Sequence, residues 1–246
     1  MTYFDGFLIP VPAADQAGFL RHAGTINPAF LEYGASRVVE CWEEDLKPGH
    51  TTDFYRAVEK TADEVVAFSW VEWPDRAVRD QGMARMDVEM KEDPRWDPAQ
   101  NPVPFDGKRM IFGGFSGILE RGESRSGSYI QGFVVPVPDD RREDYRKMAD
   151  QAWPLFQEYG ALRHIEAWGD DVPHGKQTDF YRTVKAEPGE SVVFSFLEWP
   201  SREVCDKAAE TMQNDERMAP PDGMTMPFDA KRMIWGGFTP VYELGD

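Results

Sequence analysis

Two glutamates lie at the ends of long apolar segments, where a carboxylate could carry out acid–base chemistry. Glu72 precedes Trp73 and Glu198 precedes Trp199, and each follows a run of mostly apolar residues. Burial raises the pKa of a carboxyl group, and perturbed carboxyl groups concentrate at functional sites. Glu72 and Glu198 are therefore our candidate catalytic residues, as proton donors or acceptors near pH 7. A salt bridge to a neighbouring arginine explains their positions equally well.

A second set of polar and aromatic side chains occurs in two copies and could bind a ligand. An aspartate is also common at a turn or cap, an arginine often pairs at a strand edge, and a tryptophan lies more often in a core than against a ligand. These structural alternatives stay open for every member of the set. The predicted ligand-binding residues are Glu40, Trp42, Asp53, Arg56 and Arg109, with Glu166, Trp168, Asp179, Arg182 and Arg232 in the second copy.

The histidines and cysteines do not form a repeated constellation. Neither a glycine-rich phosphate loop nor a nucleophile elbow is present. We therefore predict no metal and no cofactor. Cys41 and Cys205 occupy unrelated positions in the two copies, so unpaired thiols in a cytoplasmic protein are expected. The four histidines face different residues in the other copy: His22 aligns with Met148, His50 with Lys176, His164 with Val38 and His174 with Pro48.

Composition excludes several kinds of partner. The chain has 246 residues, 41% of them hydrophobic, and a formal net charge of −17. An acidic surface repels phosphate groups, which argues against nucleic acid and membrane surfaces as partners. Apolar runs end well before the ~20 residues that a membrane helix needs, and no signal peptide is visible at the N-terminus. A cytoplasmic globular protein with a small-molecule ligand is the expectation.

The chain repeats itself, which indicates a tandem duplication. Thr52–Arg56 recurs at Thr178–Arg182, and Phe105–Met110 recurs with one substitution at Phe228–Met233. The copies of the first motif lie 126 (178 − 52) residues apart and those of the second motif 123 (228 − 105) residues apart. The second repeat therefore has a short deletion between the two motifs. We place the first repeat at residues 1–121, an exposed and flexible linker at 122–128, and the second repeat at 129–246.

Each repeat reads as β-α-β-β-α-β. Pro-Val-Pro ends the first strand, and in the second repeat Asp139 or Asp140 is the expected cap of the helix that follows. Gly34 and Gly160 suit the left-handed residue after that helix. The Thr-Asp-Phe-Tyr-Arg segment is a candidate extra strand. In the first repeat the predicted strands are 3–9, 37–42, 65–73 and 109–115, and in the second they are 129–135, 163–168, 192–199 and 232–238.

The third strand defines the fold class. Residues 65–73 are apolar on both faces, so both faces must be covered. The element order is that of the ferredoxin-like split motif. We therefore predict an α+β protein in which two ferredoxin-like repeats pack, sheet against sheet, as an eight-stranded pseudo-dimeric α/β barrel within one chain. The candidate site is expected in this barrel, where the two sheets face each other.

The repeated motifs resemble those of a bacterial family of proteins of unknown function, number 1428. They are Asp-Asp-Val-Pro-x-Gly-Lys-x-Thr-Asp-Phe (Asp170–Phe180), Phe-Ser-x-x-Glu-Trp-Pro (Phe194–Pro200) and Met-Pro-Phe-Asp-x-Lys-Arg-Met-Ile-x-Gly-Gly-Phe (Met226–Phe238). The first repeat departs from this pattern at His50 and Val103. The resemblance implies the dimeric α/β-barrel superfamily and no established activity. Relatives by fold include cofactor-free monooxygenases, isomerases and haem-handling enzymes, among which fold alone does not choose.

Two hypotheses of function remain, and the sequence does not decide whether the protein is an enzyme. The first is a small-molecule-binding barrel with cofactor-free acid–base chemistry. The second is a non-catalytic binding or assembly protein, in which the duplication fuses an ancestral homodimer and a further homodimer stays open. A ligand-sized pocket with carboxylates and arginines pointing inward favours the first.

Overall fold

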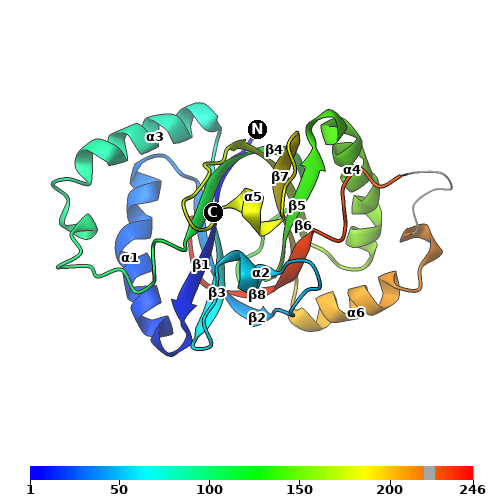
Figure 1. Cartoon of the computed structure of the whole chain (residues 1–246), viewed down its shortest axis with the longest axis horizontal. Coiled ribbons are helices and arrows are strands. Elements are labelled where there is room, and N and C mark those ends of the chain that lie inside the picture. The colour runs from blue at the N-terminus through cyan, green and yellow to red at the C-terminus, as the bar shows by residue number, and fades with distance from the viewer. Residues whose placement is uncertain (219–224, 246) are drawn as a thin grey trace.

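The computed structural model describes residues 1–218 and 225–245, and it shows two copies of one βαββαβ unit (Figure 1). The predicted second repeat ends at residue 246, which lies outside the described residues. The first repeat contains β1 (Tyr3–Pro12), α1 (Gln16–Glu32), β2 (Arg37–Asp45), α2 (Phe54–Ala57), β3 (Glu64–Trp73), α3 (Arg76–Glu89) and β4 (Ile111–Gly122). The second contains β5 (Tyr129–Pro138), α4 (Arg142–Glu158), β6 (Arg163–Asp171), α5 (Phe180–Thr183), β7 (Glu190–Trp199), α6 (Arg202–Met212) and β8 (Ile234–Gly245).

The eight strands close into one antiparallel barrel, as the sequence predicts. Their order around the barrel is β1-β3-β2-β8-β5-β7-β6-β4. Each repeat therefore contributes four neighbouring strands, and two seams join the repeats, one between β2 and β8 and the other between β4 and β6. Strands β4 and β8 continue beyond the predicted ends to reach these seams.

Helices cover the outside of the barrel. Figure 1 shows α1 and α3 on one side and α4 and α6 on the other, so each pair covers its own repeat. The outward face of β3 packs Val71 and Trp73 towards α1 and α3. Within residues 1–218 and 225–245, no helix combines the length and apolar composition needed to cross a membrane.

Local sequence determines where the long helices begin and end. Asp75 caps α3 and Ser201 caps α6, each accepting the backbone N–H three residues on. Gly34 and Gly160 have φ values of 105° and 104°, which is the left-handed conformation predicted for them. The cap predicted for α4 is wrong, because Asp139 and Asp140 lie in a 3₁₀ turn before it and the N-cap is Arg141, with no side-chain capping bond.

The Thr-Asp-Phe-Tyr-Arg segment is a one-turn helix in both repeats, and the extra strand considered for it is wrong. Asp53 accepts the backbone N–H of Arg56 at 2.7 Å and that of Gly49 at 3.0 Å. Asp179 makes the same two bonds in the second repeat. Each aspartate thus satisfies a free N–H at the helix start, which selects a helix over a strand.

Aromatic side chains from both repeats fill the barrel. Along β3 the inward residues include Phe68 and Trp70, which are fully buried, and β7 contributes their counterparts Phe194 and Phe196. The rings of Trp70 and Phe196 stack with centroids 4.3 Å apart. The barrel interior is therefore a packed core.

Four charged side chains occupy one end of this core. Arg163 of β6 donates to Glu72 at 2.8 and 2.9 Å, and Arg37 of β2 donates to Glu198 at 3.1 Å. Each arginine also lies 3.4 Å from the other glutamate. Two positive and two negative charges meet with all four side chains buried, so each compensates the desolvation of the others.

Hydrogen bonds connect the linker between the repeats, which the sequence predicts to be exposed and flexible, to the barrel. The hydroxyl of Ser124 donates to Glu198 at 2.8 Å, and the backbone N–H of Gly127 donates to Glu243 at 2.8 Å. Ser128 is buried, whereas residues 123–127 are exposed as expected. The linker therefore closes over the charged end of the barrel.

Candidate functional site

The first repeat contains a cavity of about 440 Å³ on the outer side of the barrel wall, beneath α1 and α3. Phe7 of β1, Phe19 and Ile26 of α1, and Met83 of α3 contribute to its apolar lining. Ligand sites in proteins commonly enclose about 300–1,000 Å³ with mostly apolar walls. The sequence predicts a site inside the barrel, whereas aromatic rings fill the interior and this cavity lies outside it.

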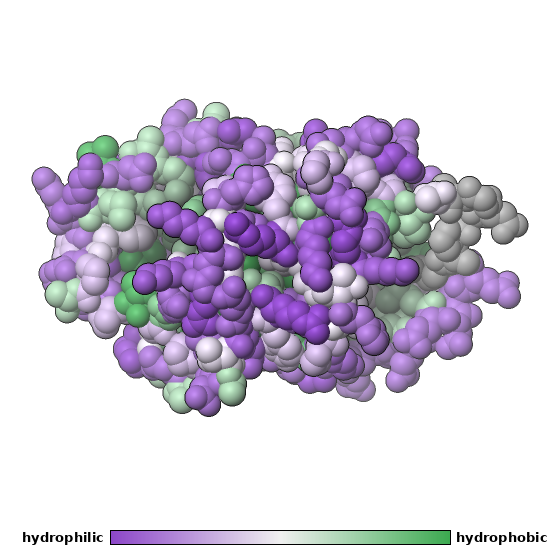
Figure 2. Space-filling model, in the orientation of Figure 1, coloured by the Kyte–Doolittle hydropathy of each residue, from purple (hydrophilic) through white to green (hydrophobic). Residues whose placement is uncertain are grey.

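The cavity reaches the protein surface. Val103 and Phe112 line it and are 48% and 49% exposed. On the face shown in Figure 2, hydrophobic side chains gather near α1 and the segment that follows α3, among otherwise polar residues. A ligand can therefore enter at this edge without displacing the sheet.

Glu40 is the buried acidic group of the cavity. It lies on β2, where Val39 and Cys41 face the barrel interior, so strand alternation turns its side chain outward beneath α1. Oε1 accepts a hydrogen bond from Nδ2 of Asn27 at 2.9 Å, and Oε2 accepts one from the hydroxyl of Ser69. One helix and one neighbouring strand thus fix the carboxylate.

Burial raises the pKa of Glu40, and the bonds from Asn27 and Ser69 only partly oppose this effect. No cation forms an ion pair with Glu40 among the described residues. A carboxylate in this environment is a stronger base than an exposed one, and its protonated form is more accessible near neutral pH.

An ion pair lies at another edge of the cavity. Nη2 of Arg79 is 2.9 Å from Oδ1 of Asp5, and Nε1 of Trp73 donates to Oδ2 at 2.8 Å. Arg79 also donates to Asp171 of the second repeat at 2.8 Å. Burial raises the pKa of Asp5, whereas Arg79 and Trp73 act to lower it. With Asp80 at 3.2 Å, three carboxylates already engage this guanidinium, so it adds polarity with little free positive charge.

Two further polar groups lie on the lining. Nδ1 of His22 is 3.1 Å from Oδ1 of Asn101, and burial lowers the pKa of His22, which favours the neutral imidazole. The indole N–H of Trp96 is buried without a hydrogen-bond partner in the structure. The lining therefore contains several polar groups that could orient a ligand.

The second repeat has a smaller counterpart of about 150 Å³. Glu166 and Ser195 occupy the places of Glu40 and Ser69. The remaining neighbours of the carboxylate have diverged. Three positions change around it: Phe19 corresponds to Tyr145, Asn27 to Trp153 and Val38 to His164.

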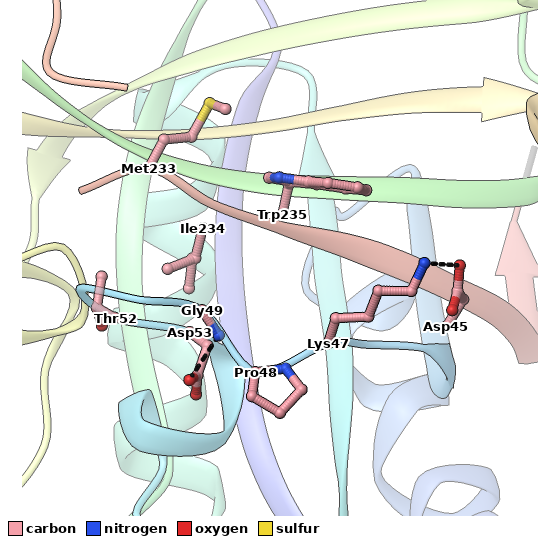
Figure 3. Close-up of a pocket in the computed structure, with 9 residues that line it drawn as sticks. All are labelled: Asp45, Lys47, Pro48, Gly49, Thr52, Asp53, Met233, Ile234 and Trp235. Atoms are coloured by element: carbon pink, nitrogen blue, oxygen red, sulfur yellow. Dashed lines mark hydrogen bonds and ion pairs between the residues drawn. The ribbon is translucent and has the colours of Figure 1, made fainter. Parts of the chain in front are cut away.

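A third, shallower pocket of about 130 Å³ lies between the loop after β2 and the start of β8 (Figure 3). Lys47 extends towards Asp45 at 3.9 Å, and Trp235 forms part of the wall. Asp53 lines this pocket, but both of its oxygens already accept hydrogen bonds: Oδ1 from the backbone N–H of Arg56, which caps α2, and Oδ2 from the backbone N–H of Gly49 in the preceding loop. Asp53 is therefore a helix cap, which is the structural alternative to ligand binding that the sequence left open for it.

The predicted catalytic pair occupies the charged end of the barrel. Glu72 and Glu198 are not among the lining residues of these three cavities. The expectation of a raised pKa is wrong for Glu72: although burial acts to raise its pKa, Arg163 and the other hydrogen-bond partners lower it below its ordinary value. The salt-bridge alternative describes the geometry of both glutamates.

The predicted arginines form local ion pairs. Arg109 makes two bonds to Glu64, at 2.8 and 2.6 Å, and Arg232 makes the equivalent pair with Glu190 at 2.6 and 2.7 Å. Arg56 and Arg182 are more exposed and contact the aspartate that caps their own helix and the loop before it. The structure does not bring these four residues to the large cavity.

The predicted tryptophans lie on the outer face of the barrel near the starts of α1 and α4. The ring of Trp42 packs 5.7 Å from that of Phe19, and the guanidinium of Arg142 lies 5.4 Å above Trp168. Neither tryptophan lines a described cavity. Of the predicted ligand-binding residues, the structure places Glu40 and Glu166 in the paired cavities and Asp53 in the shallow pocket.

The sequence analysis missed several polar residues around Glu40. Ser69 follows a phenylalanine in β3 and recurs as Ser195, so the repeat alignment contained a signal for it. Asn27 and Arg79 have no such signal, because Trp153 and Cys205 replace them in the second repeat. Among the described residues, no group of three or more His, Cys, Asp or Glu side chains is placed to hold a metal ion.

Sequence comparison finds one family and a relative half as long. The family model described as "Protein of unknown function (DUF1428)" matches residues 2–107 and 128–230. The uncharacterized protein YbaA of Escherichia coli K12 is 55% identical over 115 residues, which cover 47% of this chain and 97% of YbaA. The YbaA protein of Shigella flexneri matches to the same extent. One repeat therefore corresponds to almost a whole relative.

Solved structures share the fold over nearly the whole chain. A Lactobacillus acidophilus NCFM protein, proposed to be a monooxygenase, has a TM-score of 0.58 at 10% identity and covers 99% of this chain and 96% of its own. An anthrone oxidase-like protein has a TM-score of 0.53 at 12% identity, with 99% and 92% covered. At this identity the likeness establishes the fold, a dimeric α/β barrel, and no activity.

Proposed function

We propose that this chain, which belongs to the DUF1428 family of proteins of unknown function, binds a small organic molecule in the cavity of its first repeat and exchanges a proton with it through Glu40. The observation that carries this proposal is the buried carboxylate of Glu40 on the lining of an apolar cavity of about 440 Å³. A buried carboxylate without a cation is costly to maintain, and such groups concentrate at functional sites.

The cavity favours an uncharged and largely apolar ligand. Its walls are mostly hydrophobic and aromatic, and Asp5 and Asp171 already neutralise Arg79. A free anion would meet the carboxylates of Glu40 and Asp5, which repel it. We therefore expect a neutral ring compound that has an acidic O–H or C–H group.

The chemistry assigned to Glu40 follows from its pKa. In the ionised form its raised pKa makes it a better proton acceptor than an ordinary glutamate, and after the transfer it can return the proton. Asn27 and Ser69 hold the two carboxylate oxygens, so the base does not have to reorient during the reaction. Asn27 and Ser69 are positioning residues in this scheme.

The solved relatives by fold are consistent with this class of ligand. One is proposed to be a monooxygenase and the other is called anthrone oxidase-like, and both descriptions refer to those proteins alone. They support a search among organic ring compounds, whereas the assignment of Glu40 rests on the present geometry.

A thermal-shift screen followed by matched variants tests the proposal. Neutral hydroxy-aromatic and cyclic ketone compounds are screened against the parent protein, since a ligand that binds the folded state raises Tm. Hits are then assayed for exchange of the acidic hydrogen with deuterated solvent. Glu40→Gln should reduce the exchange rate about 10²–10⁴-fold, the usual contribution of a general base. Glu166→Gln is the matched control and should leave the rate unchanged.

A cavity-filling variant locates the site independently of the chemistry. Ala23 of α1 lines the cavity, and Ala23→Leu reduces its volume without removing a polar group. This variant should lose the ligand-induced rise in Tm. Hits that stabilise Ala23→Leu as strongly as the parent, or an exchange rate that survives Glu40→Gln, would refute the proposal.

Non-catalytic binding in the same cavity is the second candidate function. The hydrogen bonds that Glu40 accepts favour this non-catalytic function. They occupy one lone pair on each carboxylate oxygen, which leaves fewer lone pairs to take a proton from a ligand. This reading predicts ligand-induced stabilisation of the parent protein with no exchange above the solvent rate. The hydrogen-exchange assay therefore separates the two functions.

A further inference from the structure

His22 of α1 lines the Glu40 cavity, and one of its two ring nitrogens is committed to a neighbour. Nδ1 lies 3.1 Å from Oδ1 of Asn101. The amide of Asn101 has one orientation, because its Nδ2 donates to the backbone carbonyl of Arg95 at 3.0 Å. Oδ1 of Asn101 only accepts, so Nδ1 of His22 carries the proton. In the neutral imidazole, which burial favours, Nε2 is then a hydrogen-bond acceptor.

Nε2 of His22 is free to bond to a ligand. It makes no hydrogen bond with any residue that the structure describes. Within residues 1–218 and 225–245, the fully buried side-chain nitrogens and oxygens without a partner belong to Tyr3, Tyr33, Trp96 and His164. Nε2 of His22 is not among these atoms, so this unpaired nitrogen keeps accessible surface. Because the side chain forms part of the lining, a ligand in the cavity can reach it.

The imidazole of His22 is held in place before any ligand binds. The ring of Phe105 meets it edge-on, with centroids 5.8 Å apart and planes at 88°. Arg95 joins the segment after α3 to α1 through two bonds to Glu32, at 2.9 and 2.8 Å, and this segment includes Asn101. The free acceptor is therefore preorganised, which lowers the entropic cost of forming a hydrogen bond to it.

A second free acceptor lies next to Glu40. Nδ2 of Asn27 donates to Glu40, which leaves Oδ1 of the same amide on the cavity lining. This oxygen has no hydrogen-bond partner among the described residues and is not fully buried. Arg79 and Arg95 also line the cavity, but carboxylates engage both guanidinium groups. A ligand thus meets acceptors both at Glu40 and at His22, and this favours a ligand with a donor for each place.

The geometry of α1 separates these two places. Asn27 and His22 are five residues apart in one helix, and their positions therefore differ by about 7.5 Å along its axis. This separation favours an elongated ligand of two fused rings over a single ring. The cavity of about 440 Å³ falls in the usual range for ligand sites, so it has room for such a compound.

We propose that the ligand of the Glu40 cavity is a two-ring compound with a hydrogen-bond donor at each end: an acidic group that meets Glu40, and a hydroxyl that donates to Nε2 of His22. His22 is then a specificity-determining residue. This inference rests on the proposed function, since it takes the same cavity as the ligand site, and it adds the requirement for a second donor. The equivalent residue of the second repeat is Met148, which offers no such acceptor.

Two naphthalene compounds of nearly the same shape test the second donor. In 2,6-dihydroxynaphthalene each end carries a hydroxyl, whereas 6-methoxy-2-naphthol has an ether at one end and cannot donate there. The dihydroxy compound should bind the parent protein about tenfold more tightly, the effect of one hydrogen bond whose acceptor is otherwise left unpaired. Isothermal titration calorimetry measures both dissociation constants. Ala23→Leu, which fills the cavity, should abolish the binding of both compounds.

His22→Met completes a comparison of two ligands with two proteins. The variant introduces the residue of the second repeat and removes the acceptor. Binding of the dihydroxy compound should weaken about tenfold and that of the methoxy compound less than about threefold, because only the first compound donates to His22. The preference between the ligands should therefore disappear. Equal losses for both compounds would mean that His22 only packs against the ligand, and would overturn the hydrogen bond.

NMR of protein labelled with ¹⁵N-histidine detects the bond in the parent protein. The signals of His22 are assigned by their loss in His22→Met. On addition of the dihydroxy compound the Nε2 signal should move upfield, as that of an imidazole acceptor does when it is hydrogen-bonded, and it should move less with the methoxy compound. His164, which lines the smaller cavity of the second repeat, is the control and should not respond. A response of His164 in place of His22 would overturn the proposal.

The outcomes separate this inference from the proposed function. Equal affinity of the parent for both compounds, lost in Ala23→Leu, would overturn the role of His22 and leave the proposed function standing. Failure of both compounds to bind the parent would overturn the two-ring ligand, and the other hits of the thermal-shift screen would then decide the proposed function. A preference for the dihydroxy compound that His22→Met removes, with a shift of the His22 Nε2 signal, supports the inference.

Discussion

Phe68 and Phe194, which are equivalent residues of the two repeats, stack on each other inside the barrel with ring centroids 4.6 Å apart and planes within 9°. The opposite wall makes room for them. A Cβ atom at Gly6 would lie 2.9 Å from the Phe194 ring, and one at Gly132 would lie 2.8 Å from the Phe68 ring. Each repeat therefore provides a glycine against which the phenylalanine of the other repeat packs, so the core belongs to both repeats.

Gly6→Val is predicted to destabilise the protein by about 1–3 kcal/mol, because the added methyl groups overlap a ring in a packed core. Urea unfolding of parent and variant measures the change in the free energy of unfolding. Combining it with Phe194→Leu should cost less than the sum of the two single changes, since residues in contact couple. Strict additivity would contradict the described contact.

Removing one charge from the barrel's end is predicted to be strongly destabilising. Glu198→Gln leaves Arg37 and Arg163 with a single buried glutamate, and the loss of one partner of a buried pair typically costs about 3–5 kcal/mol. Glu120→Gln is the control, because Glu120 contacts the same Arg163 at 2.6 Å but its side chain is 45% exposed. The control should change the free energy of unfolding by about 1 kcal/mol or less; equal effects of the two variants would contradict the account.

The pair between Glu64 and Arg109 predicts a pH effect in acid. Arg109 lowers the pKa of Glu64 to about 2, below its ordinary value of 4.5. A lowered folded-state pKa stabilises the folded protein at pH values above the ordinary pKa of the group. This contribution is lost as the pH falls through the folded-state pKa. Parent and Glu64→Gln should therefore differ most in Tm above pH 5 and converge towards pH 2. A difference that grows on acidification would contradict the assigned direction.

The raised pKa of Glu40 leads to the opposite pH dependence of stability. Burial raises its pKa, so its contribution to stability is fully present below the ordinary value of 4.5 and is lost as the pH rises through the folded-state pKa. The stability difference between Glu40→Gln and the parent should move in favour of the variant between pH 4 and pH 8. Thermal unfolding across this range measures it, and a movement in favour of the parent would count against the raised pKa.

Both thiols are predicted to be unreactive in the folded protein. Cys41 and Cys205 are free and buried, and burial raises the pKa of Cys205 to about 12 and that of Cys41 well above its ordinary value. The thiolate is the reactive form, so labelling by a disulfide reagent should be slow at pH 7. Two thiols per chain should react at once in denaturant. Rapid labelling of the native protein would contradict this burial.

The fold could be predicted from the sequence because short motifs and strand patterns indicate it, and each of them is present in both repeats. The repeated motifs located the strands, and the apolar faces of residues 65–73 indicated that both sides were covered. Alternation does not say which face turns towards the interior. Glu40 was therefore recognised as a candidate but placed inside the barrel, whereas it faces α1.

The predicted pKa shift of Glu72 illustrates a second limit of the sequence. Glu72 follows apolar residues, as a perturbed acid would, but its partner Arg163 is 91 residues away in the other repeat. Only closure of the barrel brings them together, and this contact reverses the predicted direction of the pKa shift. The role of Asn27 could not be predicted either. Asn27 donates a hydrogen bond to Glu40 from α1, but the equivalent residue of the second repeat is Trp153, so the repeat does not mark this position.

The strand order has a consequence for how the protein assembles. A single repeat would expose the edges of β2 and β4, and exposed edges are templates for aggregation. In one chain, β8 and β6 are tethered near those edges, so closure of the barrel is intramolecular. Its thermal midpoint should therefore not fall on dilution, unlike that of a barrel formed by two separate chains. The duplication makes barrel closure independent of how much protein the cell contains.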